Sequence, residues 1–208
     1  MYTPRHNVVD DEAEIRRMVK AARTAWFVTT GADGFPQATY LPILWRGSTV
    51  IAHLARANRH WRGLAQDAPA LLIVTGADAY ISPSWYERKQ IDGRVVPTWD
   101  YTAVNLTGTV RVHEDPAWLR AAVTELTDAH EAGREHPWAV TDAPGDHIDF
   151  ELSGIVGIEI TVTGIEGKAK LNQNYSEADR RGVVEGLTGE PFAGAAEVAE
   201  QVASTFTS

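Results

Sequence analysis

The chain has 208 residues, of which 44% are hydrophobic and 23% charged, proportions typical of a globular protein rather than a disordered or fibrous one. Its 28 Asp and Glu exceed its 19 Lys and Arg and give a formal net charge of -9, which disfavours direct binding to a nucleic-acid backbone. The absence of cysteine excludes disulfides, thiolate metal sites and a Cys nucleophile.

Hydrophobic periodicity predicts one helix followed by several strands in the first third of the chain. Residues 10–22 carry apolar side chains at helical spacing after an acidic N-cap. Segments 25–30, 37–44 and 49–54 read as strands joined by Gly-containing turns, with Pro42 suited to an edge or a bulge. One or two helical turns at 61–66 then lead to 70–74, an apolar run typical of a buried strand.

The second half predicts two more strands and three helices. Residues 104–112 and 156–163 alternate apolar and polar, and Pro116 begins a helix over 116–132. Two helices are expected at 176–187 and about 193–203. Six strands without early βαβ alternation predict a mainly β protein of the α+β class, with an antiparallel sheet rolled into a small barrel and peripheral helices. We expect one domain, with a barrel over 1–187 and a helical extension over 188–208.

Three segments combine polar and aromatic residues beyond the needs of core packing. The loop 53–61 holds two Arg, two His and an Asn, which suits a phosphate, although a solvated loop anchored by a Trp is an equally good interpretation. The aromatic segments 79–86 and 96–101 would form walls for a planar ligand, or a cluster in the core or a dimer interface. Lys168 and Lys170 would neutralise a dianion, or keep an edge strand solvated.

These segments, in this order and together with 1–6, 39–42 and 167–174, resemble the PaiB-type family of FMN-binding negative transcriptional regulators. The resemblance extends from Met1 to about Leu187. It implies a split β-barrel related to the pyridoxamine-phosphate-oxidase-like flavoproteins. It also implies a homodimer that holds FMN at the subunit interface.

The resemblance further implies which residues bind the cofactor. Arg56 is the first choice for the phosphate, with His53 and Asn58 as hydrogen-bond partners. Backbone groups of the strand that contains Thr39, Tyr40 and Leu41 would meet the flavin ring. The aromatic segments and the C-terminal lysines and Gln173 would form walls of the site, in part contributed by the second subunit. The remaining residues of this set are Thr39, Tyr40, Leu41, Trp61, Trp85, Trp99, Lys168, Lys170 and Gln173.

Three positions depart from the family pattern, and one of them is Asn172, where the family usually has Ser before Gln. Arg59 follows Asn58 where the family usually has Pro, which adds a positive charge beside the expected phosphate. Asp100 stands where the family usually has Asn. A carboxylate near a flavin would disfavour an anionic reduced ring, so we expect Asp100 to affect redox behaviour more than the fold.

Three functions remain open from the sequence. The first is FMN-dependent redox chemistry on a small molecule, since a flavin carries the chemistry without a visible acid–base pair. The second is a ligand-responsive negative regulator, for which direct DNA binding is not expected because no DNA-reading motif is present. The third is a split-barrel protein that binds haem through a His. No catalytic residue or metal site is predicted, and the lack of a signal or spanning segment leads us to expect a cytoplasmic protein.

Overall fold

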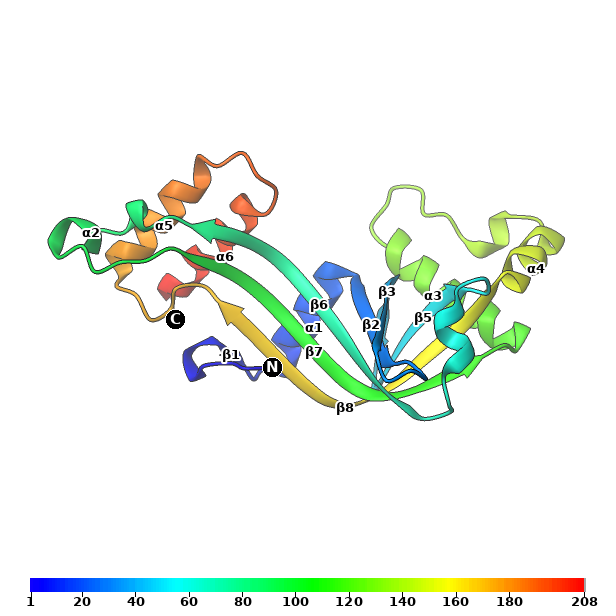
Figure 1. The fold of residues 1–208 in the computed structure, drawn as a ribbon. Coiled ribbons are helices and arrows are strands. Elements are labelled where there is room, and N and C mark those ends of the chain that lie inside the picture. Colours follow the sequence, from blue (N-terminus) through cyan, green and yellow to red (C-terminus); the bar gives the residue numbers. More distant parts are fainter. Residues whose placement is uncertain (208) are drawn as a thin grey trace. The chain divides into compact units, whose positions relative to one another are not determined.

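The computed structural model describes residues 1–207 and combines one β-sheet with helices (Figure 1). The strands are β1 (Val8–Val9), β2 (Thr24–Thr30), β3 (Pro36–Pro42), β4 (Leu44–Arg46), β5 (Thr49–Ala55), β6 (Ala68–Ile81), β7 (Thr98–His113) and β8 (Ile155–Lys170). The α-helices are α1 (Glu12–Ala22), α2 (Arg88–Ile91), α3 (Pro116–Glu131), α4 (Gly145–Ser153), α5 (Glu177–Thr188) and α6 (Ala195–Ser204). Short 3-10 turns are η1 (Arg5–Asn7), η2 (Arg59–Gly63), η3 (Pro83–Trp85), η4 (Val140–Asp142) and η5 (Thr205–Thr207). Within residues 1–207, no helix is both long and apolar enough to cross a membrane.

The sheet has the order β3-β2-β6-β7-β8-β5-β4, with β1 paired to β8 off this path. The pairs β2/β3, β2/β6, β4/β5, β5/β8 and β1/β8 are antiparallel. The predicted α+β class with an antiparallel sheet is therefore confirmed. Strand β3 lies at one end of this order, so its outer backbone groups face away from the sheet.

The chain forms two compact units, which we describe separately. Unit 1 consists of residues 1–15, 75–104 and 166 onward, and unit 2 consists of residues 16–74 and 105–165. The long strands β6, β7 and β8 contribute residues to both units. The division into a barrel over 1–187 and an extension over 188–208 stays a prediction.

Each unit has its own apolar core. In unit 1, the buried faces of α5 and α6 pack with the end of β6, and Tyr86 lies among them. Gly182 and Gly186 let the backbone and indole of Trp85 approach α5, because a Cβ at Gly186 would lie 2.2 Å from the indole. In unit 2, alternate residues of the strands are fully buried, including Phe27, Val50, Leu54, Leu72 and Ile158, and α3 covers Ile51 with Ala122 and Leu126.

Several predicted boundaries were wrong. The strand predicted over 37–44 is broken after Pro42, because the Ile43 N–H leaves the ladder and donates to the Arg23 carbonyl at 2.9 Å. The strands β6, β7 and β8 are 14, 16 and 16 residues long, well beyond the segments predicted. Strand β1 was not predicted, and the break after Pro42 divides one predicted strand into β3 and β4, so the sheet has eight strands rather than six. Helices α2 and α4 were not predicted either.

We expect Gly157→Ala to destabilise the protein by about 1–3 kcal/mol, the usual cost of overpacking. A Cβ at Gly157 would lie 2.0 Å from the Trp118 ring, which is itself stacked on His113 at 3.9 Å between centroids. The free energy of unfolding in urea measures the loss. Gly145→Ala is the control, because a Cβ there meets nothing within 4 Å. Equal stability of the two variants would contradict the packing of Trp118.

Candidate functional site

A buried histidine attaches the loop after β5 to strands β2 and β3. The His60 Nε2 atom lies 2.8 Å from the Thr29 hydroxyl, and its Nδ1 atom lies 2.8 Å from the Thr39 hydroxyl. The ring stacks on Phe27 with centroids 4.8 Å apart. Burial lowers the pKa of His60, which favours the neutral ring. A neutral ring donates at one nitrogen and accepts at the other, and threonine hydroxyls serve both roles.

Asn58 completes this attachment. Its Oδ1 accepts the His60 N–H at 2.9 Å and its Nδ2 donates to the Thr39 hydroxyl at 3.4 Å. The structure thus brings together Asn58 and Thr39, two residues of the predicted site. His60 was missed as a site residue, although an Asn two residues before it is the pattern of a side-chain cap on a short helical turn.

Arg56 is held in place by backbone carbonyls of unit 2. Its Nε donates to Ser153 O at 3.0 Å and its Nη2 to Ile155 O at 3.2 Å, while Nη1 pairs with the exposed Glu114 carboxylate at 2.6 Å. A guanidinium has five N–H donors, so two are left after these three contacts, and the Glu114 carboxylate is the anion with which Arg56 pairs in this structure.

Trp61 connects the cations of this loop. Its indole N–H donates to the Arg56 carbonyl at 3.1 Å. The guanidinium carbons of Arg56 and Arg62 lie 5.9 and 5.8 Å from its ring centroid. Arg59 and Arg62 are both exposed. The loop therefore presents two arginines beside one aromatic ring and a third, Arg59, exposed next to them in the sequence, which is a suitable surface for an anion.

The edge strand β3 lies beside this loop. Tyr40 is 55% exposed, its hydroxyl is 2.6 Å from the Thr24 hydroxyl, and its ring centroid is 5.1 Å from that of Trp26. Leu41 points into the core, where it is buried. A planar ligand beside β3 would thus meet the outer backbone groups of Thr39, Tyr40 and Leu41, which lie on an edge strand.

His53 faces a different space from the arginines. Its side chain lines a cavity of about 330 Å³ beside α3, together with Pro42, Val123, Leu126, Thr127, His130, Glu131 and Trp138. Within residues 1–207, neither His53 Nδ1 nor His130 Nε2 has a hydrogen-bond partner, and both atoms are buried. Burial also lowers the pKa of His53. No group of three metal-ligating side chains forms in this part of the chain.

The predicted lysines belong to unit 1 and are bound there. Lys168 is buried, and its Nζ donates to the Tyr101 hydroxyl at 2.6 Å. Lys170 donates to the Thr98 hydroxyl at 2.7 Å and to the carbonyl of Trp99. Both ammonium groups therefore already hold β8 to β7, and a ligand would share them rather than find them unpaired.

The other predicted residues of unit 1 differ in exposure. The Gln173 side chain closes the turn after β8 through two hydrogen bonds to backbone groups. Trp85 packs against the core cluster with α5. Trp99 is 54% exposed and its ring meets that of the exposed Tyr80 edge-on at 6.0 Å. Trp99 is accordingly better placed than Trp85 to form a ligand wall.

Asp100 is the most constrained charge in unit 1. Its side chain is fully buried, and within the described chain neither carboxylate oxygen has a hydrogen-bond partner. Lys170 Nζ lies 3.5 Å from Oδ1. Burial raises the pKa of Asp100 to about 7, and Lys170 opposes that shift. Asp100 therefore exchanges its proton near neutral pH.

We expect Asp100 to make the protein less stable as the pH rises. Its folded pKa lies above its unfolded value near 4, so the stability it contributes is complete below pH 4 and is lost between pH 4 and about 7. Asp100→Asn should remove this fall and raise the free energy of unfolding at pH 8 by about 1–3 kcal/mol. Urea denaturation at pH 5 and pH 8 measures the difference.

Asp146→Asn is the matched control, because Asp146 is exposed. A pH dependence that is unchanged in Asp100→Asn would contradict a buried, titrating Asp100.

Comparison with known proteins identifies relatives along almost the whole chain. The family model described as "Putative FMN-binding domain" matches residues 1–164. The protease synthase and sporulation protein PAI 2 of Bacillus subtilis (strain 168) is 33% identical over 204 residues, which cover 96% of this chain and 95% of that protein. These matches confirm the predicted family resemblance.

Solved structures share the fold at low sequence identity. A conserved hypothetical protein from Mycobacterium tuberculosis has a TM-score of 0.61 at 16% identity, with 85% of this chain and 95% of that chain covered. The FAD and haem binding protein from Mycobacterium smegmatis has a TM-score of 0.60 at 19% identity, with 79% and 73% covered. The predicted split-barrel fold is thereby confirmed.

Proposed function

The chain belongs to the FMN-binding domain family whose model it matches, and we propose that it is a homodimeric flavoprotein that uses FMN for redox chemistry on a small molecule. The observation that carries this proposal is the hydrogen bonding of the arginine-bearing loop to the edge strand β3 through Thr39, Asn58 and His60. It puts groups suited to a phosphate next to backbone groups suited to a flavin ring.

The phosphate would bind at the loop. Arg56 is fixed by two carbonyls and keeps two N–H donors, so it would bind a phosphate without losing further side-chain entropy. Arg59 and Arg62 are exposed on the same loop and would add positive charge. In a chain with a net charge of -9, this cluster is a local positive surface that suits an anionic group.

The flavin ring would lie along β3. The outer N–H and C=O groups of this edge strand would recognise the polar edge of the ring, as strand-like hydrogen bonding requires only an unpaired edge. When bound, FMN supplies the transfer of hydride or single electrons, and the protein supplies binding, orientation and electrostatics. These roles fit the proposed site, which offers hydrogen-bond donors and aromatic surface and for which no acid–base pair is predicted.

A second subunit would complete the site. Unit 2 exposes Trp26, Phe35 and Tyr40 on the β2–β3 hairpin, and unit 1 exposes Tyr80 and Trp99. Exposed aromatic groups of this kind are typical of protein interfaces. We propose that Trp99, Lys168 and Lys170 reach a flavin of the partner chain. Trp85 and Gln173 are already engaged inside unit 1, by the core and by a backbone turn.

A regulatory role would use the same site as a sensor. With a net charge of -9 and no DNA-reading motif, the chain would act on transcription through a partner or a ligand rather than by reading an operator. Sequence-specific gel shifts at physiological salt would contradict this part of the proposal.

Haem is the second candidate cofactor. His53 and His130 line one largely apolar cavity, and each has a buried ring nitrogen without a partner in the described chain. Burial lowers the pKa of His53 and so favours the neutral imidazole that binds iron. A haem site at this place would leave the loop arginines unused.

The visible absorption spectrum separates the two cofactors. The protein is purified without added cofactor, incubated with FMN, and desalted. Retained flavin bands that bleach on anaerobic addition of NADH or NADPH would support the proposed function. A Soret band without flavin absorption would favour haem, and a protein that retains neither would contradict both.

We expect Arg56→Ala to weaken FMN binding by about 1.5–3 kcal/mol, more than tenfold in Kd, because it removes a charged hydrogen-bond donor from the phosphate. Fluorescence titration of FMN measures Kd. Arg56→Lys keeps the charge but loses the paired donors, so its Kd for FMN should lie between those of the wild-type protein and Arg56→Ala.

Arg120→Ala is the control, because Arg120 makes a surface ion pair with Asp149 in the same unit. An Arg56→Ala variant that folds and keeps the wild-type Kd would refute the phosphate assignment.

A further inference from the structure

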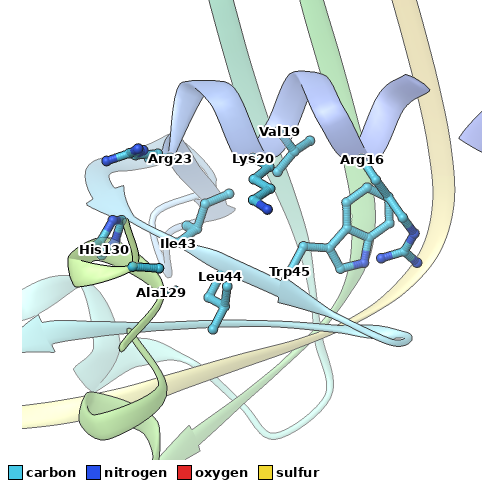
Figure 2. A pocket seen from close by; sticks show the side chains of 10 residues that line it. Arg16, Val19, Lys20, Arg23, Ile43, Leu44, Trp45, Ala129 and His130 are labelled. Carbon is cyan, nitrogen blue, oxygen red and sulfur yellow. The ribbon is translucent and has the colours of Figure 1, made fainter. Parts of the chain in front are cut away.

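A second cavity of unit 2 is not used by the proposed FMN site. It has a volume of about 400 Å³ and lies between α1, the junction of β3 and β4, and the C-terminal end of α3 (Figure 2). That volume is within the usual range for small-molecule sites, roughly 300–1,000 Å³. None of the residues expected to bind FMN lines it.

The lining of this cavity divides into an apolar part and a cationic part. Val19, Ile43, Leu44, Trp45 and two alanines of the α3 end form the apolar part. The cations are Arg16 and Lys20 of α1 and Arg23, which follows the helix. His130 closes the side at α3. No carboxylate is among the lining residues, although the chain has 28 Asp and Glu.

The spacing of the sequence explains the cationic part. Arg16 and Lys20 are four residues apart, so they share one face of α1 with Val19. Arg23 directly follows the last residue of the helix. It has a φ of 61, and its carbonyl accepts the Ile43 N–H at 2.9 Å. This backbone contact fixes the end of α1 against the break between β3 and β4.

The three cations differ in how far they are engaged. The Arg16 guanidinium lies 3.9 Å from the Trp45 ring centroid and donates to Gly47 O at 2.7 Å, so Arg16 forms a wall. Among residues 1–207, Lys20 and Arg23 have no ion pair and no side-chain hydrogen bond. Figure 2 shows Lys20 projecting from α1 into the cavity.

We propose that this cavity is a second ligand site, which binds a small organic anion with an apolar body. The anionic group would lie at Lys20 and Arg23, and the apolar body would cover Ile43, Leu44 and Trp45. An inorganic anion would leave these apolar walls uncovered, and a neutral apolar ligand would leave the two cations without a counter-charge.

The test uses octanoate as the probe, with acetate and 1-octanol as probes that keep only its charge or only its apolar body. Isothermal titration of the full-length protein measures each Kd. We expect octanoate to bind at least about tenfold more tightly than either partial probe, because both parts of the lining contribute. Octanol binding as tightly as octanoate, or no octanoate binding at millimolar concentration, would overturn the proposal.

Variants locate the binding. Lys20→Gln should weaken octanoate binding about 2- to 5-fold and leave octanol binding unchanged, since it removes only a charge from an exposed helix position. Arg17→Gln removes the same charge from α1 outside the cavity and should leave both unchanged. An equal loss in the two variants would show attraction by net charge alone and would overturn the proposal.

The titration is repeated with saturating FMN to distinguish this site from the flavin site. Unchanged octanoate affinity supports two separate sites. Competition between octanoate and FMN would overturn the inference, because the cavity would then belong to the flavin site.

Discussion

The candidate site depends on one buried ring, His60, held between the hydroxyls of Thr29 and Thr39. A neutral imidazole needs one donor and one acceptor, and two hydroxyl partners satisfy both nitrogens without adding charge to the interior. Because Thr39 also accepts from Asn58, the same bonds fix the loop and its arginines beside the edge strand β3. Were His60 to become charged, both ring nitrogens would be donors, and the buried ring would lose solvation without gaining a counter-ion. Burial lowers the pKa of His60 and so favours the neutral ring in this position.

The fold was predictable where a signal is local. Helices α1 and α3 follow from amphipathic spacing and from caps, and they lie within about two residues of their predicted bounds. The long strands were underestimated because their ends in unit 1 carry residues such as Gly76 and Asp78, which interrupt the apolar alternation. Strand β4 was merged with β3 because the acceptor that ends β3, the Arg23 carbonyl, lies at a turn about 20 residues earlier in the chain.

The site was predictable in composition but not in arrangement. The resemblance named Arg56, Asn58 and Thr39, and the structure shows the last two in contact. No local pattern indicates that Arg56 would be fixed by carbonyls 97 and 99 residues further along the chain, or that His53 would face α3 instead of the arginines. Cations on and just after a helix, such as Arg16, Lys20 and Arg23, are ordinarily solvated. The chain after the break at Pro42 lines a cavity together with them, and no local pattern indicates that.

Asp100 stands where the family usually has Asn, but its carboxylate repels an anionic ligand less than a permanently charged group would. A fixed carboxylate would repel negative charge on any ligand held in unit 1, but a group with a pKa of about 7 is half protonated at neutral pH. Lys170, 3.5 Å away, offsets much of the remaining charge, since attraction at that distance is strong in a buried setting. Added negative charge nearby would raise the Asp100 pKa further and drive it toward the neutral acid. Asp100 would therefore become neutral by taking up a proton when an anionic ligand binds nearby. Its full negative charge would repel such a ligand only at alkaline pH.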